Sequence, residues 1–210
     1  MKMIRDIVST RYNYLNGDQL MKLIKHTAVL ASAISLALIS GVAPAETSGY
    51  LSIKQVKVEL KGKGDSKTLD VEINAGNTIP ADGKSGAFGY AALTDDGNNL
   101  LVLATHLPID DSSHEDPSSG FHTHVLDLKA PTDACKGANF EVDLENSGKN
   151  SAFDADYKWK LEGDKISVKN VPVSDLGNAG VEAVVSFKLK PILDANKKPT
   201  NLCVTVIDQA

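Results

Sequence analysis

Four histidines lie within a window of 19 residues, and no other group of side chains in the chain suggests chemistry as strongly. They are His106, His114, His122 and His124, while the fifth histidine, His26, lies far upstream. Neutral imidazole nitrogens are common ligands of Zn²⁺ and Cu²⁺, and three or four of them are enough to hold one such ion. The clustering therefore predicts a site for one divalent transition metal.

Two of these histidines are predicted to lie side by side. His122 and His124 are two residues apart in a strand expected over 122–128, so both imidazoles point to the same face of the sheet. That face also carries Leu126 and Leu128, which places the pair near the rim of the hydrophobic core. A metal ion held there is partly dehydrated, and its ligands stand on a rigid strand.

The other two histidines belong to the segment just before this strand. His106 ends an expected strand over 100–106, which is apolar on both parities, as in a central strand. If the two strands form a hairpin, the 15-residue connection over 107–121 brings His106 beside the pair and leaves His114 in the loop as a fourth ligand. Connections of that length are usually functional or disordered. Four carboxylates are alternative oxygen ligands, or acceptors for imidazole N–H groups: Asp110, Asp111, Glu115 and Asp116.

The string Gly120-Phe121-His122-Thr123-His124 resembles the G-F-H-x-H copper-ligand strand of the Cu/Zn superoxide dismutases. The resemblance implies that such a strand presents two imidazoles to copper. In that family, further metal-binding histidines and an aspartate follow downstream, whereas no histidine follows His124 in this chain. A two-metal site and dismutase activity are therefore not expected.

Three functions are compatible with this pattern. All methionines lie in the first 21 residues and both cysteines are expected to form a disulfide, so the soft ligands that Cu(I) prefers are absent downstream, and Cu(II) or Zn(II) is the expected cofactor. No motif places a nucleophile beside a histidine. The leading hypothesis is therefore metal carriage, buffering or sensing without catalysis. A metalloenzyme with a three-His site, using zinc hydrolytic or copper redox chemistry, is the alternative. A structural or adhesive surface module without metal is the third.

The N-terminus has the features of a secretory signal. Two lysines precede an apolar run over 27–39, and small residues occupy the −3 and −1 positions before a cut after Ala45. We therefore expect an N-terminal extension over 1–20, a signal peptide over 21–45 and a single mature domain over 46–210. The protein is predicted to be periplasmic or secreted, without a stable membrane span after cleavage. An uncleaved membrane anchor is the alternative.

Charge and cysteine content agree with an exported protein. Beyond residue 45 the chain has 17 basic and 25 acidic residues, a net charge of −8, and no stripe of Lys or Arg. Nucleic acid is therefore not an expected partner, whereas a metal ion and another periplasmic or surface protein are. Cys135 and Cys203 are predicted to form a disulfide in an oxidising compartment. Two free thiols that bind metal are the alternative.

The rest of the mature chain alternates apolar and polar residues, the pattern of half-buried strands. Leu51 to Leu60 follows it with one slip at Gln55, where a β-bulge restores the register. Gly, Asn and Asp clusters separate about eight to ten such strands, and no segment has a helical period. We therefore expect an all-β fold, an antiparallel β-sandwich of immunoglobulin-like or similar Greek-key type. The clearest strands centre on 69–74, 88–93, 140–144, 157–161, 185–189 and 202–206.

Overall fold

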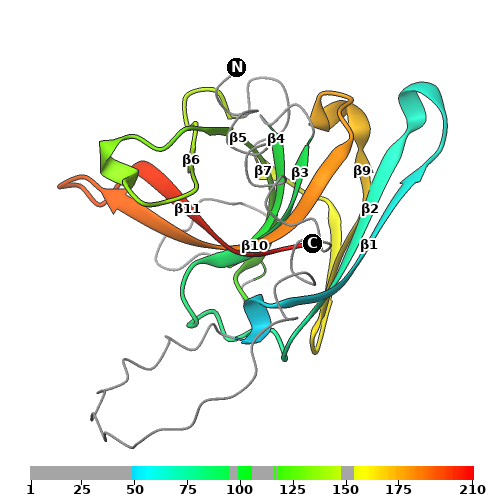
Figure 1. The fold of residues 1–210 in the computed structure, drawn as a ribbon, viewed down its shortest axis with the longest axis horizontal. Coiled ribbons are helices and arrows are strands. Elements are labelled where there is room, and N and C mark those ends of the chain that lie inside the picture. The colour runs from blue at the N-terminus through cyan, green and yellow to red at the C-terminus, as the bar shows by residue number, and fades with distance from the viewer. Residues whose placement is uncertain (1–48, 95–98, 106–115, 117, 148–153) are drawn as a thin grey trace, which may run out of the picture. The chain divides into compact units, whose positions relative to one another are not determined.

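The computed structural model of this chain contains two antiparallel sheets (Figure 1). The structure describes residues 49–94, 99–105, 116, 118–147 and 154–210, and for 99–105 and 154 it describes the backbone. The smaller sheet has the order β1 (Ile53–Lys61), β2 (Thr68–Ala75), β9 (Lys165–Pro172), β8 (Lys158–Glu162). The larger sheet has the order β4 (Asn99–Thr105), β3 (Phe88–Thr94), β10 (Val181–Leu193), β11 (Pro199–Gln209), β6 (Phe140–Val142), β5 (Phe121–Lys129), β7 (Asp154–Ala155).

The larger sheet curls until its strands meet. β4 pairs with β5 as well as with β3, so β4, β3, β10, β11, β6 and β5 form a closed ring, and β7 adds to β5 alone (Figure 1). Within the described residues the connections contain only short 3₁₀ turns: η1 (Gly49–Leu51), η2 (Gly64–Ser66), η3 (Asp133–Cys135) and η4 (Val173–Leu176). No helix among the described residues has the length and hydropathy of a membrane span.

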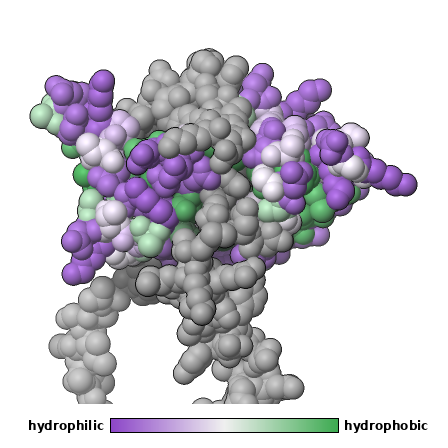
Figure 2. Space-filling model, turned by 90° about the horizontal axis from the view of Figure 1, so that it is seen from above, coloured by the Kyte–Doolittle hydropathy of each residue, from purple (hydrophilic) through white to green (hydrophobic). Residues whose placement is uncertain are grey.

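Two hydrophobic clusters fill the described part of the molecule because strands β3, β5 and β10 are buried on both faces over much of their length. On β10, the inner face carries Val185 and Phe187, while Val184 points to the outer face, against the smaller sheet. The cluster inside the ring contains Ala91, Leu126, Leu128, Val142, Val185, Phe187, Leu202 and Val204. The cluster between the ring and the smaller sheet includes Leu69, Val71, Phe88, Tyr90, Phe121, Val125, Ile166 and Val168. In the view of Figure 2, hydrophilic residues dominate the described surface, with apolar residues between them.

The prediction of an all-β antiparallel sandwich is confirmed. The register of β1 against β2 shifts between Ile53 and Gln55, where the sequence predicted a bulge. One long strand, β9, was not predicted. Asn170 has a positive φ of 58° in this strand, and the register against β2 shifts there. Strict alternation from the buried Val168 would bury Asn170, but the shift buries Val171 instead. The bulge breaks the pattern by which the strand could have been recognised.

A disulfide joins Cys135 in η3 to Cys203 on β11, as predicted, with the two Cα atoms 5.2 Å apart. Cys203 pairs with Glu141 of β6, so the disulfide lies where the short strand β6 joins the ring. Because β6 is only three residues long, its own backbone pairing is limited, and the disulfide adds a covalent tie beside it. The alternative of two free metal-binding thiols is therefore excluded for this pair.

Glu141 is a carboxylate held under η3 with 1% of its surface exposed. Its Oε2 accepts hydrogen bonds from the Thr132 N–H at 2.9 Å and from the Thr132 hydroxyl at 2.7 Å, while Oε1 accepts one from the Asn201 amide at 2.8 Å. The Lys129 ammonium lies 3.6 Å from Oε1. Burial by itself raises the pKa of a carboxyl, but these donors outweigh it and lower the pKa of Glu141 to about 2.

Glu141 is therefore expected to stabilise the fold at neutral pH and to lose this effect in acid. Its pKa is about 2 in the folded chain, against an ordinary value of 4.5. The stabilisation is complete above the ordinary value, disappears as the pH falls towards the folded value, and amounts to roughly 3 kcal/mol. Glu141→Gln should lower the free energy of unfolding in urea at pH 7, and the difference from wild type should shrink as the pH falls to the folded pKa. Glu182→Gln, an exposed position on β10, is the control; equal effects of both changes at pH 7 would contradict the prediction.

Candidate metal site

β5 carries both of the best predicted ligands and pairs with three other strands, β4, β6 and β7. Its residues from Phe121 to Asp127 pair with β4 in antiparallel register, with His122 opposite Ala104 and His124 opposite Val102. The predicted hairpin between these two strands is therefore present. On its other side, β5 pairs with β7 through Thr123 and with β6 near its end. The strand that presents the two imidazoles is thus held on both edges.

His122 and His124 are almost fully buried, with 0% and 2% of their surfaces exposed. By the alternation of the strand they share the face of Leu126 and Leu128, which belong to the cluster inside the ring. The Nε2 atoms of the two imidazoles lie 2.8 Å apart, and the ring planes are nearly perpendicular, at 88°. The prediction that the two side chains lie together on a core-facing side is confirmed, and their burial exceeds that of a rim position.

The hydrogen bonds fix which nitrogen carries the proton on His122. Its Nδ1 lies 3.2 Å from the carbonyl oxygen of Gly120, which can only accept, so Nδ1 carries the hydrogen. In a neutral imidazole Nε2 then has the lone pair, and the Nε2–H of His124 donates to it. His122 is therefore held with its Nε2 lone pair directed at His124. A backbone carbonyl that accepts from the other ring nitrogen is a usual orienting partner of metal-binding histidines.

Gly120 and Phe121, the two residues before His122, help to fix the position of the two histidines on β5. Gly120, the residue just before β5, has a φ of 72°, in the left-handed region that favours glycine. In this conformation the carbonyl oxygen of Gly120 lies beside Nδ1 of His122. Phe121 points to the other face of β5, where it is fully buried and lies 5.8 Å from the ring of Phe88 and 5.9 Å from that of Trp159. The sequence predicted carboxylates as acceptors for imidazole N–H, and it gave no signal for the Gly120 carbonyl.

Two small residues of β3 lie level with the histidines in the ring. Through β4, the register aligns Gly89 with the level of His122 and Ala91 with that of His124. Ala91 belongs to the inner cluster, and Gly89 shares its parity. A closed ring is filled best when large and small side chains alternate across it. Gly89 and Ala91 therefore add no large side chain to the rows of the ring that hold the two imidazoles.

The structure describes only part of the predicted ligand set. Asp116 lies in the turn before β5, where its carboxylate accepts hydrogen bonds from the N–H and hydroxyl of Ser118, which lower the pKa of Asp116. Within the described ranges, no group of three or more His, Cys, Asp or Glu side chains is arranged to hold a metal ion. The remaining predicted residues lie outside the described residues: His106, His114, Asp110, Asp111 and Glu115.

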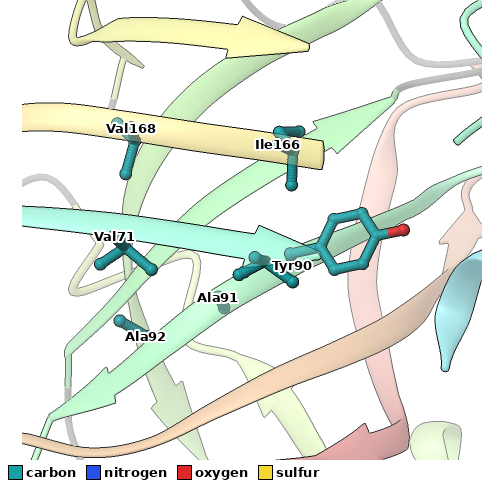
Figure 3. Close-up of a pocket in the computed structure, with 7 residues that line it drawn as sticks. Val71, Tyr90, Ala91, Ala92, Ile166 and Val168 are labelled. Atoms are coloured by element: carbon teal, nitrogen blue, oxygen red, sulfur yellow. The ribbon is translucent and has the colours of Figure 1, made fainter. Parts of the chain in front are cut away.

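A cavity between the sheets offers no competing site for an organic ligand. It lies between β2, β9 and β3 and is lined by the side chains of Val71, Ile73, Ile166 and Val168 and by the Tyr90–Ala92 segment (Figure 3). It has room for about one water molecule, far less than the several hundred Å³ of a typical small-molecule pocket. This cavity is a packing gap within the sandwich core.

The chain matches no protein-family model, no curated protein and no solved structure. Its function is therefore inferred from its own residues and their geometry.

Proposed function

We propose that this chain is an exported β-sandwich protein that holds one divalent transition metal, Cu(II) or Zn(II), through a histidine cluster built on His122 and His124. Its role is metal carriage, buffering or sensing. His106 and His114 complete the ligand set in this proposal, with the nearby acidic residues as alternative ligands. The observation that carries the proposal is the convergence of two buried Nε2 atoms to 2.8 Å on one strand.

This separation suits two ligands of the same ion. Two nitrogens, each about 2.0 Å from a metal, lie about 2.8 Å apart when they subtend a right angle, as in tetragonal Cu(II), and about 3.3 Å apart in a tetrahedral Zn(II) site. The observed 2.8 Å is also the length of a hydrogen bond between the two imidazoles. Conversion of the hydrogen-bonded pair into a chelating pair requires both rings to turn until their lone pairs meet at the ion, while the Nε2–Nε2 separation can stay the same. Cu(II) requires the least change in the Nε2–Nε2 separation.

Both imidazoles can bind as neutral ligands. His122 already has its hydrogen on Nδ1, bonded to the Gly120 carbonyl, and its Nε2 lone pair accepts from His124 until an ion takes that place. His124 needs its hydrogen moved from Nε2 to Nδ1, a change of tautomer that alters no net charge. A cation thus replaces the hydrogen bond between the two imidazoles, and neither ligand has to gain or lose a net proton. Two neutral ligands leave the charge of the ion itself uncompensated, which is costly in a protein interior, so the proposal needs the acidic residues that precede β5 as ligands or counter-charges.

Burial of both imidazoles favours holding an ion over turning over a substrate. Catalytic metal sites keep an open position that a substrate or water can reach. Both side chains are at most 2% exposed. The disulfide between Cys135 and Cys203 is compatible with an oxidising compartment, and it supports export. A metal-binding protein of the periplasm or the cell exterior agrees with both features.

The direct test is the metal content of the mature protein, purified without an affinity His-tag from cells that express the full sequence. We expect about one equivalent of copper or zinc by mass spectrometry, or the uptake of about one equivalent on reconstitution, with a rise in Tm because an ion that binds only the folded chain stabilises it. Absence of metal, together with no uptake of Cu²⁺ or Zn²⁺ and no thermal shift, would overturn the proposal and favour a structural module.

A further inference from the structure

The inference concerns β1, the outer strand of the smaller sheet. Among the described residues β1 pairs only with β2, so its other backbone edge has no strand partner there (Figure 1). Val58 and Leu60 pair with Val71 and Leu69, which are buried in the sandwich core, so this row belongs to the core-facing side of the sheet. Yet Val58 is 40% exposed and Leu60 is 57% exposed.

An open strand edge with an apolar row is a template for pairing with another strand. The outward row of β1 carries charges that alternate in sign at Lys57, Glu59 and Lys61. In Figure 2, hydrophilic and hydrophobic residues lie next to each other at the end of the molecule where β1 and β2 extend. A strand that pairs with this edge must therefore place apolar side chains beside the apolar row of β1 and oppositely charged side chains beside its charged row.

The sequence of β1 matches itself when it is reversed about Val58. In an antiparallel pair of two β1 strands centred there, Lys57 of each copy faces Glu59 of the other, which gives two opposite-charge pairs on one face. On the other face Val58 meets Val58, and Val56 of each copy meets Leu60 of the other. The exposed side chains thus gain apolar neighbours, and no like charges within the segment 56–60 face each other.

We propose that two copies of this chain associate through β1, in antiparallel register about Val58, so that their smaller sheets form one continuous sheet. The charge and apolar complementarity of residues 56–60 with their own reverse selects a second copy as the occupant of this edge. Each copy then completes the backbone hydrogen bonding of the other's edge strand. This association is independent of the metal site, because β1 belongs to the other sheet.

Charge exchange tests this register. The protein, purified from cells that express the full sequence, is measured by sedimentation velocity over a wide range of concentration, where the wild type should show a monomer–dimer equilibrium. Lys57→Glu replaces two attractive pairs by two repulsive ones and should raise the dissociation constant about tenfold or more. Glu59→Lys should act in the same way. Mixing these two variants should restore association, because both carboxylates of the first variant then face lysines of the second.

The double exchange Lys57→Glu with Glu59→Lys is expected to dimerise like the wild type, which separates a register effect from damage to the strand. Lys190→Glu, an exposed position on β10, is the control for net charge and should leave the dissociation constant unchanged. Equal Tm values across the set show that the monomer is intact. A monomer at every concentration would overturn the proposal, and so would a dimer that is indifferent to both single changes or is not restored by mixing.

Discussion

Replacing His122 and His124 together by glutamine is expected to reduce the metal content from about one equivalent to less than about a tenth of one. Glutamine is similar in length, and it keeps a polar group at both buried positions while removing the nitrogens that converge at 2.8 Å. Each single change should weaken binding by more than about 100-fold, since even orienting partners of a ligand contribute 10- to 100-fold. Metal content and affinity are measured by mass spectrometry and by competition with a chelator.

Thr123→Val is the matched control, since Thr123 lies between the two histidines but points to the other face of β5. Its hydroxyl donates to the carbonyl of Ala155 and accepts from the Tyr157 N–H at 3.3 Å. This variant should lose stability, measured as Tm, and yet keep its metal. Full metal content in the double glutamine variant would exclude the pair as ligands. Loss of metal in Thr123→Val, at a temperature where it is folded, would indicate that binding depends only on the integrity of the strand.

Removing the disulfide is expected to have the largest effect on stability. The two cysteines are separated by 68 residues, and closing a loop of that length lowers the entropy of the unfolded chain enough to stabilise the fold by roughly 4 kcal/mol. The variant Cys135→Ala with Cys203→Ala should therefore lower the free energy of unfolding in urea by about that amount. Alanine is preferable to serine because both positions are buried, at 2% and 4% exposure, and a serine hydroxyl would need a partner there.

Reduction of the wild-type protein provides the control for this change. The reduced wild type and the alanine variant should unfold at similar urea concentrations, because both lack the cross-link, although the alanines also leave a small cavity. The mass of the oxidised wild type should be lower than that of the reduced protein by two hydrogen atoms. A loss below about 1 kcal/mol in both samples would mean that the unfolded chain gains little freedom when the bond is absent.

Features set by short-range pattern were predictable from the sequence. The period of two in a strand places His122 and His124 on one face, so their proximity was predicted. Consecutive strands with a polar connection favour a hairpin, so the pairing of β5 with β4 was predicted as well. A chain with two cysteines allows one intramolecular pairing, and it is present. The β1 bulge was visible as a slip in the alternation at Gln55.

Features set by long-range pairing were not predictable. Closure of the ring depends on β6, a strand of three residues that joins β5 to β11, and nothing in its alternation shows which strands it contacts. The burial of β5 on both faces follows from that closure and from the smaller sheet on its outer side. The tautomer of His122 depends on the carbonyl of Gly120, a backbone group that has no signature in the sequence. These properties follow from the assembled fold and not from any single segment.

The short strand β6 has a consequence for where the ring opens. It is held by two residue pairs on each side, with Asn139 and Asp143 adding one backbone bond to either neighbour, whereas β10 and β11 share a long register. Local opening starts where few bonds must break, so the ring is expected to open first at β6. The disulfide beside β6 opposes this opening, so amide hydrogen exchange at β6 is expected to be faster in the reduced protein than in the oxidised one.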